Sequence, residues 1–337
     1  GNPDGLTKGI VFFGPPRRRN ATTKTDPGML SGFRKRILFI INPAAGGVRR
    51  PWRDAALVRE LMRTTRHEWA IRYSEAVGHA RDLAAQAAAD GYEVVVAIGG
   101  DGTINEVAGG LINTDTALAV IPAGSGNGLA REMGIPLNRK RAIGALADAM
   151  PGIMDVGVTQ DRIFLNVCGV GIDAEIARLF NEEASETVRH RATYVYLVFR
   201  EFFSYRPRRH RIEFNGVQID RAPLLLAVAN NRQYGSGAII SAGARAADGL
   251  LNVVIHPHRG IARTALVDTA AFFRGRLEHV AGHETWPTER VRLHADEPFW
   301  AHADGESFLV ESGTLEISVI KHALRVFVPK PPRVLEI

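Results

Sequence analysis

The chain of 337 residues is long enough for two ordinary domains, and 45% of its residues are hydrophobic, so each domain can bury a core. Because no run approaches the roughly 18 apolar residues of a membrane span, and the first thirty residues lack the apolar segment of a secretory signal, we expect a cytoplasmic protein. The single cysteine, Cys168, excludes an intrachain disulfide and a cysteine-based metal site, while the net charge of +6 suits nucleic acid, an anionic membrane surface or anionic substrates without choosing among them.

Residues 1–32 contain glycine, proline, threonine and the basic run Arg17–Arg19 without hydrophobic periodicity. Such a composition cannot bury enough apolar surface to fix one conformation, so we expect a flexible leader. The arginine run is typical of a solvated tail, although contact with anionic lipid would also suit it.

From Arg36 onward, short apolar strands alternate with helical segments. The expected strands cover residues 37–41, 69–73, 93–98 and 117–121, and the expected helices cover residues 52–65, 79–89, 105–112 and 139–150. Strands that alternate with helices at this spacing predict a doubly wound parallel sheet with right-handed crossovers, which is an α/β fold.

Three of these strands end in turns of small or polar residues, at Asn42–Gly47, Gly99–Thr103 and Pro122–Gly128. In a doubly wound sheet such turns share the carboxyl edge where ligands bind, so we expect them to converge on one ligand. Glycine lets the backbone approach a ligand, and a following helix supplies free N–H groups and the positive end of its dipole, so the expected ligand is a phosphate. Asp101 in the second turn can hold a cation or a phosphate-bound water. Taken alone, GGDG would also suit a tight turn with an incidental acid.

Strand-like runs dominate after Gly157. We expect strands at residues 162–167, 211–214, 224–229, 250–255, 290–295, 300–303 and 314–320, with helices near residues 173–180, 192–203 and 261–274. This pattern predicts a second domain, a mainly antiparallel β-sandwich over residues 159–320. A last strand at 323–328 is expected to return to the first domain, which then covers residues 33–158 and about 321–332.

The segment from Ala192 to Arg211 combines aromatic residues with five arginines. One interpretation is that it lies against a membrane or guides a lipid. The other is a helix with one buried aromatic face and a solvated basic end, and the composition does not separate the two.

Four motifs occur in a fixed order: GGDGTINEV at 99–107, PAGSGNGLAR at 122–131, MDVG at 154–157 and DGE at 304–306. Together they resemble the diacylglycerol kinase catalytic-domain family, which includes bacterial lipid kinases and the sphingosine and ceramide kinases. The resemblance covers about Arg36 to Val328. GGDGT alone is shared with NAD kinases and phosphofructokinases, whereas the combination in this order and spacing is specific.

The resemblance implies ATP-dependent transfer of a γ-phosphoryl group to a lipid hydroxyl, with the nucleotide on the first domain and the lipid entering between the domains. It implies that ATP contacts the turns after the first four strands, at Asn42, Pro43, Ala44, Ala45, Gly46, Ser74, Gly99, Gly100, Asp101, Gly102, Thr103, Asn105, Gly124, Ser125 and Asn127. Ser74 stands where the family has threonine, and its hydroxyl can keep the phosphate contact.

The same resemblance assigns the Mg²⁺ of Mg·ATP to Asp101 and Asp155. It implies that Asp304 accepts the proton of the lipid hydroxyl, and that Glu306 supports Asp304 or shares this role. Phosphoryl transfer needs such groups because it depends on positioning and on neutralising negative charge. We therefore expect Asp101, Asp304 and Glu306 to be catalytic, although Asp304-Gly305 by itself would be interpreted as a hairpin turn.

Two further positions bear on the resemblance. Arg245, Asp248 and Leu250 lie where bacterial members have a structural Mg²⁺ held by one carboxylate and backbone carbonyls. Many bacterial diacylglycerol kinases also have aspartate directly after the asparagine that corresponds to Asn127, whereas this chain has Gly128 there. That departure resembles the sphingoid-kinase version of the turn and leaves the lipid acceptor open.

The histidines lie in strand and loop contexts without metal-ligand spacing. We expect structural roles or solvent exposure for them, including His256, His258, His294 and His302.

We thus expect ATP and Mg²⁺ as cofactors and a lipid substrate at a membrane surface, with the protein cytoplasmic and peripherally membrane-associated. Two other functions stay open. A kinase of a soluble acceptor such as NAD is favoured by GGDGT and disfavoured by PAGSGN and DGE, and Gly128 permits a nucleotide-binding regulatory protein without turnover. No aromatic-basic recognition module is present, so nucleic acid is not an expected partner. Whether the chain forms a homodimer is left open.

Overall fold

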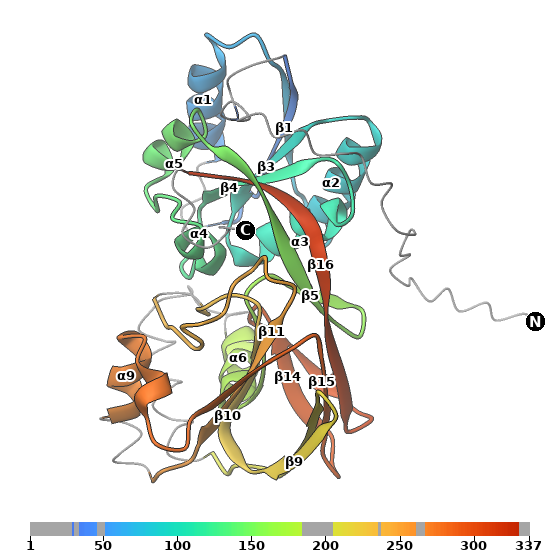
Figure 1. Ribbon diagram of the computed structural model, residues 1–337. Coiled ribbons are helices and arrows are strands. Elements are labelled where there is room, and N and C mark those ends of the chain that lie inside the picture. The colour runs from blue at the N-terminus through green and yellow to red at the C-terminus, as the bar shows by residue number, and fades with distance from the viewer. Residues whose placement is uncertain are drawn as a thin grey trace, which may run out of the picture.

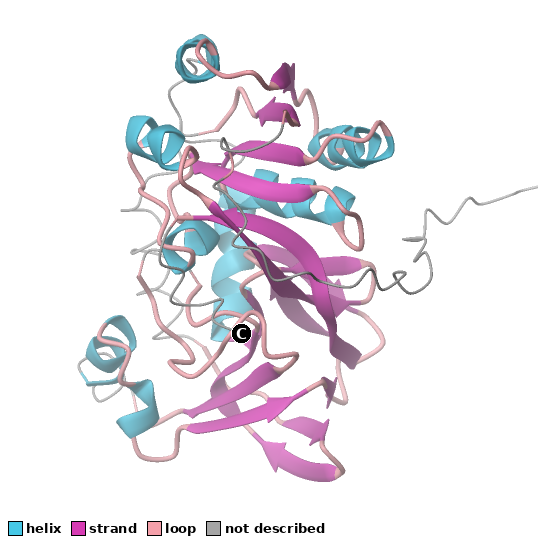
Figure 2. Ribbon diagram, turned by 45° about the horizontal axis from the view of Figure 1, so that its top comes forward, coloured by secondary structure: helices cyan, strands magenta, loops and turns pink. Residues whose placement is uncertain are grey.

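Four strands near the amino terminus form a parallel sheet in the order β2–β1–β3–β4, as the alternating sequence pattern predicts (Figure 1). They are β1 (Arg36–Ile41), β2 (Glu68–Tyr73), β3 (Val94–Gly99) and β4 (Ala117–Pro122). Every residue of β3 and β4 is buried, because helices cover both faces of the sheet (Figure 2). The computed structural model describes residues 29, 34–45, 51–183, 205–234, 237–260 and 267–329.

The helices of this part are α1 (Pro51–Met62), α2 (His79–Ala89), α3 (Asp101–Leu111), α4 (Gly128–Glu132) and α5 (Arg139–Ala145). Helix α3 begins earlier than the predicted start at Asn105, because Gly100 in extended conformation already forms its N-cap. The sequence pattern did not predict α4. Helix α5 ends before the predicted end at Met150, because Met150 pairs with Val328 in the sheet, and local propensity does not reveal such a long-range pairing.

Strand β16 (Thr314–Val328) joins the two halves of the molecule. It runs antiparallel to β5 (Met150–Thr159), as Figure 1 shows, and pairs in parallel with β4 through Val326 and Leu118. Its first part pairs with β13 (Arg290–His294), and the sheet continues to β8 (His210–Phe214) and β9 (Val217–Arg221). The two strands predicted at 314–320 and 323–328 are therefore one strand with an irregularity between Ile320 and Leu324.

A second, antiparallel sheet packs against the far part of the first. Its strands, in spatial order, are β12 (Glu284–Thr288), β11 (Leu251–Pro257), β10 (Pro223–Ala229), β7 (Val167–Gly171), β14 (Phe299–Ala303) and β15 (Glu306–Val310). The short strand β6 (Arg162–Phe164) pairs with β5. Apolar side chains of both sheets fill the space between them, including Phe214 and Val291 from one sheet and Val253 and Phe299 from the other. The predicted fold class, a parallel α/β part followed by a β-sandwich, is confirmed.

The described residues of the carboxyl-terminal half also contain α6 (Ile172–Glu183), α9 (Thr269–Phe273) and the 3₁₀ segment η2 (Leu277–His279). The helix predicted at 192–203 lies outside the described residues, and α9 occupies the described end of the helix predicted at 261–274. Within the described ranges, we find no helix that is both long enough and apolar enough to cross a membrane.

Of the leader predicted at 1–32, the structure describes Met29 alone. This residue is fully buried in the core of the parallel sheet, and its N–H donates to the carbonyl of Ala149 at 2.6 Å. At this one position the chain is packed rather than solvated, and the other leader residues lie outside the described part of the chain.

Candidate active site

The glycine-rich turns after β3 and β4 pack backbone against backbone. A Cβ atom added to Gly124 would lie 2.7 Å from the Cα atom of Gly100, so neither turn has room for a side chain there. Asn127 closes the second turn on itself, because its Oδ1 accepts the Gly124 N–H at 3.0 Å and its Nδ2 donates to the Gly124 carbonyl at 2.8 Å. These glycines therefore permit the close contact of the two turns.

The turn after β1 joins the same group. Asn42 donates from Nδ2 to the Thr103 hydroxyl at 2.8 Å, and its Oδ1 accepts the Ala44 N–H at 2.9 Å. Ser74, after β2, is buried, and its N–H donates to the carbonyl of Ile41 at 3.0 Å. Pro43 and Ala45 lie in the same turn as Asn42, whereas Gly46 is outside the described residues. The structure thus brings the turns after β1, β3 and β4 to one edge of the sheet.

The amino terminus of α3 lies where these turns meet. Gly100 makes no side-chain cap, so the N–H groups of the first turn have no partner within the helix. Those N–H groups and the helix dipole favour an anion at this point. Gly102 is exposed here, whereas Thr103 is buried and bonded to Asn42. The region combines the properties of a phosphate-binding site.

Asp101, the first residue of α3, reaches across to the amino terminus of α4. Its Oδ1 accepts the Gly128 N–H at 2.8 Å, and a Cβ on Gly126 would lie 2.8 Å from its Oδ2. Burial raises the pKa of the Asp101 carboxyl, and the nearby charge of Asp304 raises it further, although the Gly128 N–H opposes both effects. The contact with Gly128 holds one carboxylate oxygen in place.

Gly128 has no space for a side chain. A Cβ at this position would lie 2.5 Å from the Tyr234 carbonyl oxygen and 3.4 Å from Nδ2 of Asn166. The departure from the bacterial aspartate therefore coincides with a close backbone contact between α4 and the segment after β10.

Asp304 lies in the tight turn between β14 and β15. Ala303 pairs with Glu306, and both turn residues have positive φ, 48° for Asp304 and 90° for Gly305, as a two-residue type I′ hairpin requires. The hairpin interpretation of Asp304-Gly305 is thus correct for the backbone. Asp304 also has a role beyond the turn, because its side chain points toward α3 and bonds to Asn105.

The Asp304 carboxylate accepts four hydrogen bonds. Oδ1 accepts the N–H groups of Asn166 at 2.8 Å and Val167 at 3.1 Å, while Oδ2 accepts the Leu165 N–H at 2.6 Å and Nδ2 of Asn105 at 3.1 Å. A carboxylate offers about four lone-pair positions, so these donors use them all. Burial raises the pKa of Asp304, and the four donors oppose that change by favouring the ionised form.

Asn105 and Glu306 complete the group around α3. Nδ2 of Asn105 also donates to the Ile163 carbonyl at 3.2 Å, so this side chain connects α3 to strand β6 and to Asp304. Glu306 is exposed, and its Oε1 lies 3.5 Å from the position that a Cβ on Gly102 would occupy. The structure therefore gathers Asp101, Asp304 and Glu306 around the first turn of α3.

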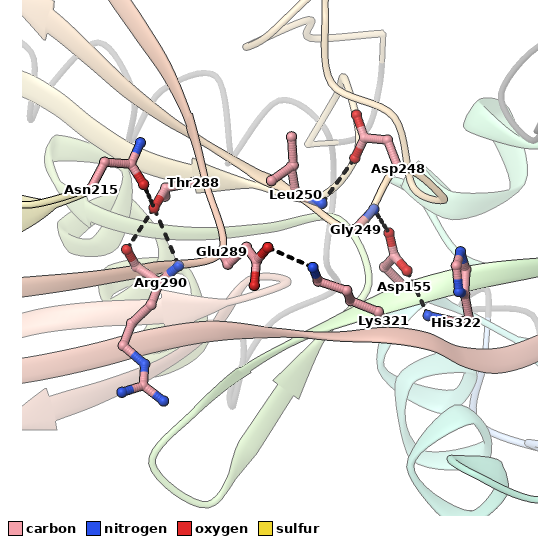
Figure 3. Close-up of polar contacts among 10 residues, drawn as sticks. All are labelled: Asp155, Asn215, Asp248, Gly249, Leu250, Thr288, Glu289, Arg290, Lys321 and His322. Carbon is pink, nitrogen blue, oxygen red and sulfur yellow. Dashed lines mark hydrogen bonds and ion pairs between the residues drawn. The ribbon is translucent and has the colours of Figure 1, made fainter. Parts of the chain in front are cut away.

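Asp155 belongs to a different cluster. It is fully buried in β5, and its two carboxylate oxygens accept the N–H groups of Gly249 and His322, each at 2.6 Å (Figure 3). The residues of the predicted structural Mg²⁺ site, Arg245, Asp248 and Leu250, lie in the adjoining loop before β11. Here Asp248 accepts the Leu250 N–H at 3.0 Å, and burial and the charge of Asp155 raise its pKa.

Neither carboxylate contact of Asp155 involves Asp101 or Asp304. Across the described ranges, no group of three or more histidine, cysteine, aspartate or glutamate side chains has the arrangement of a metal site. The Mg²⁺ roles of Asp155 and of the 245–250 loop stay predictions.

Sequence reasoning missed a polar segment that follows β10. Asn230 is fully buried, and its Nδ2 donates to the carbonyls of Asp155 and Leu165, both at 2.9 Å. Arg232 and Gln233 donate to the buried carboxylate of Glu132 on α4 at 2.7 Å and 2.8 Å. The available signal was a run of polar residues directly after a buried strand, the same signal that marked the amino-terminal turns.

A cavity of about 490 Å³ opens in the carboxyl-terminal half, beside α6 and the start of β14. Its lining combines apolar and basic side chains, among them Phe299, Trp300, Arg178, Arg206, Arg208 and His210. His210 is 2% exposed and its Nδ1 has no hydrogen-bond partner; burial, with a contribution from Arg208, lowers its pKa to about 4. The cavity therefore has an apolar wall, several arginines of which Arg178 pairs with the lining acid Glu175, and one unpaired buried polar atom.

Comparison with known proteins gives a consistent result. Residues 36–159 match the model of the diacylglycerol kinase catalytic domain, and residues 166–328 match the YegS C-terminal NAD kinase beta sandwich-like domain. A probable lipid kinase YegS-like protein of Pseudomonas aeruginosa is 30% identical over 88% of this chain and 98% of its own. A diacylglycerol kinase of Mycobacterium tuberculosis is 32% identical over 74% of this chain and 82% of its own. The crystal structure of a putative diacylglycerol kinase from Bacillus anthracis has the same fold, with a TM-score of 0.73 at 17% identity over 94% of this chain and 100% of its own.

The contact between Gly128 and Tyr234 yields a stability prediction. Gly128→Ala and Gly128→Asp should each lower the free energy of unfolding by about 1–3 kcal/mol, because an added Cβ must displace the Tyr234 carbonyl. Urea denaturation measures the change. Gly144→Ala is the control, since Gly144 lies in α5 with no atom within 4 Å of an added Cβ, and it should be neutral or stabilising. A Gly128→Asp protein of unchanged stability would contradict the prediction.

A second prediction concerns Asp155. Asp155→Asn should lower the free energy of unfolding by about 2–3 kcal/mol, because the amide nitrogen would face a buried N–H that the carboxylate now accepts. Asp161→Asn, at an exposed turn, should change it by less than about 0.5 kcal/mol. The loss should be equal in EDTA and in Mg²⁺. A stabilisation by Mg²⁺ that wild type shows and Asp155→Asn lacks would instead support a metal ligand.

Proposed function

Because this chain belongs to the diacylglycerol kinase catalytic-domain family of lipid kinases, we propose that it transfers the γ-phosphoryl group of Mg·ATP to the hydroxyl group of a lipid. The observation that carries this proposal is the gathering of three carboxylates, Asp101, Asp304 and Glu306, around the first turn of α3, where Gly102 is exposed. A helix amino terminus binds phosphate, and nearby carboxylates can bind Mg²⁺ and accept a proton.

On the nucleotide side, the proposal uses the turns after β1, β3 and β4. The N–H groups at the start of α3 bind the phosphates, with Ser125 and Asn127 bordering the nucleotide from the next turn. This nucleotide part comprises residues 33–158 and about 321–332, a range that includes the end of β16, and the acceptor part comprises residues 159–320. The close contact of Gly100 with Gly124 supports this arrangement, since it fixes the two turns relative to each other.

Asp101 fits Mg²⁺ best among the predicted ligands. Its carboxylate is an oxygen donor of the kind Mg²⁺ prefers; its Oδ1 accepts the Gly128 N–H at 2.8 Å, and the backbone N–H of Asn127 also favours its ionised form. Asp155 fits less well, because backbone N–H groups occupy both of its oxygens. When bound, Mg²⁺ would neutralise phosphate charge.

Glu306 is the group that we assign as proton acceptor. Asp304 has four donors on its carboxylate, whereas Glu306 is exposed beside Gly102. Glu306 takes the proton of the lipid hydroxyl, the hydroxyl oxygen bonds to the γ-phosphorus, and the bond from that phosphorus to the bridging oxygen of ADP breaks. In this proposal Asp304 holds the hairpin in place, and Glu306, which the hairpin presents to α3, accepts the proton.

Three variants test this assignment. Glu306→Gln should lower kcat by about 10²- to 10⁴-fold without changing stability, because it removes an exposed base. Asp304→Asn should lower both activity and stability, because its amide nitrogen would face backbone N–H donors. Asp101→Ala should abolish turnover at ordinary Mg²⁺ concentrations. The matched control is Asp296→Asn, whose side chain is fully exposed.

The measurement is phosphate transfer from labelled ATP to a panel of lipids in mixed micelles, with NAD as a soluble acceptor in parallel. Transfer to NAD and to no lipid would replace the proposal with the soluble-acceptor kinase. ATP binding without transfer to any acceptor would support the other alternative, a nucleotide-binding regulatory protein without turnover. Full activity of Glu306→Gln would overturn the assignment of the base while leaving lipid phosphorylation in place.

For the acceptor, we propose that the cavity beside α6 receives part of the lipid at a membrane surface. Its apolar wall suits a hydrocarbon chain, and Arg206 on its rim is exposed and makes no hydrogen bond or ion pair in the described part of the chain. A basic side chain there favours an anionic bilayer. The proposal therefore places the protein in the cytoplasm, peripherally associated with the membrane from which it takes the lipid.

Arg206→Glu tests this placement. It should raise the KM for lipid presented in vesicles with anionic phospholipid by about fivefold or more, since one basic side chain near such a surface contributes about 1 kcal/mol. The KM for ATP should stay the same. Arg221→Glu, on the edge strand β9, is the control of equal charge change. An equal response of both variants would mean that general charge, and not this rim, governs lipid presentation.

A further inference from the structure

A buried polar network lies directly behind the Asp304-Gly305 turn. His302, at 3% exposure in β14, accepts the Gly305 N–H at its Nδ1 at 3.2 Å. Its Nε2 lies 3.2 Å from Oδ2 of Asp173 in α6. The same Oδ2 accepts the Tyr234 hydroxyl at 2.5 Å. Asp173 lies in α6, Tyr234 in the segment after β10 and His302 in β14, and their side chains meet behind the hairpin.

The contacts define the protonation of His302. An N–H donor facing Nδ1 requires that Nδ1 carry a lone pair, so the imidazole is neutral with its proton on Nε2. That proton points at Asp173, which accepts it. A carboxylate that fixes the tautomer of a histidine in this way lets the other ring nitrogen perform a directed task.

Gly169 supplies independent evidence that the network is specific. This residue lies in β7 directly opposite His302 in β14. A Cβ on Gly169 would overlap both Oδ2 of Asp173 and Nε2 of His302. The contact between Asp173 and His302 therefore exists only because position 169 lacks a side chain.

We propose that His302 is a positioning residue for phosphoryl transfer: through the Gly305 N–H it fixes the hairpin turn that presents Asp304 and Glu306 to α3, and Asp173 sets the tautomer that this requires. The physical need arises from the turn itself. Asp304 has a left-handed backbone at φ 48°, which an L-residue adopts at a cost that neighbouring contacts must offset. This inference rests on the proposed function, because it assigns His302 to the presentation of those carboxylates.

Two isosteric variants separate the two ring nitrogens. In His302→Asn the amide oxygen takes the place of Nδ1 and can still accept the Gly305 N–H, whereas the contact with Asp173 is lost. In His302→Gln the side chain still reaches Asp173 but offers nothing to Gly305. The proposal expects His302→Asn to keep kcat within about threefold of wild type. It expects His302→Gln to lower kcat by about 10²-fold with the KM for ATP unchanged, the cost of a catalytic group misplaced by about 1 Å.

A spectroscopic readout checks the tautomer without any assay of activity. In ¹⁵N-histidine spectra of the full chain, the His302 resonances, assigned from their loss in His302→Asn, should show an unprotonated Nδ1 and a protonated Nε2. In Asp173→Asn, the Ala174 N–H holds the amide oxygen at the Oδ1 position, so the NH₂ group faces His302 and the proton should move to Nδ1. A protonated Nδ1 in wild type would overturn the proposal.

Gly169→Ala provides a variant that leaves every polar group in place. It should separate Asp173 from His302, shift the tautomer signal as Asp173→Asn does, and lower kcat. Wild-type kcat in a folded His302→Gln protein would overturn the positioning role. That failure is distinct from failure of the proposed function, in which wild type transfers phosphate to no lipid.

Discussion

The Asp304 carboxylate is the interaction on which the site depends. Its four hydrogen bonds join the β14–β15 hairpin to the β6–β7 turn and, through Asn105, to α3 in the other half of the molecule. A single buried carboxylate thus connects three segments that lie far apart in the sequence. Because an unsatisfied buried N–H is costly, this arrangement is specified more sharply than apolar packing alone would specify it. It determines where Glu306 lies relative to the first turn of α3.

Two close backbone contacts fix the glycine-rich turns and α4 on the other side of the candidate site. Gly100 meets Gly124 between the glycine-rich turns, and Gly128 meets the Tyr234 carbonyl between α4 and the segment after β10. In each case the backbones can approach only because a Cβ is absent, so packing alone requires glycine at Gly124 and Gly128, whether or not a ligand binds there. Glu132, bound by Arg232 and Gln233, adds a buried ionic contact along the same boundary. The site is therefore preorganised by main-chain contacts and by carboxylates with satisfied hydrogen bonds.

Much of the architecture could be predicted from the sequence. Apolar runs such as 93–98 and the alanine-rich helix at 79–89 have strong periodicity, and the structure has β3 at Val94–Gly99 and α2 at His79–Ala89. Convergence of the turns followed from one rule, that parallel strands share their carboxyl edge. Boundaries that depend on distant partners were missed: the strand from Met150 exists because Val328 pairs with it, and β16 is one strand because β5 supports it along its length. The histidines had no interpretable spacing, since Asp173 and His302 are 129 positions apart.

The sequence by itself determined the parallel sheet, the β-sandwich and the residue types of the site, because periodicity and glycine-rich turns are local properties of the chain. Its resemblance to the kinase family also predicted Asp101, Asp304 and Glu306 as a catalytic set. Only the tertiary structure decided how that set is divided, with Asp304 saturated by donors and Glu306 exposed, and only it separated Asp155 from Asp101 by giving its oxygens to Gly249 and His322. The physical reason is that a carboxylate's role depends on which donors surround it, and those donors come from segments that only folding brings together.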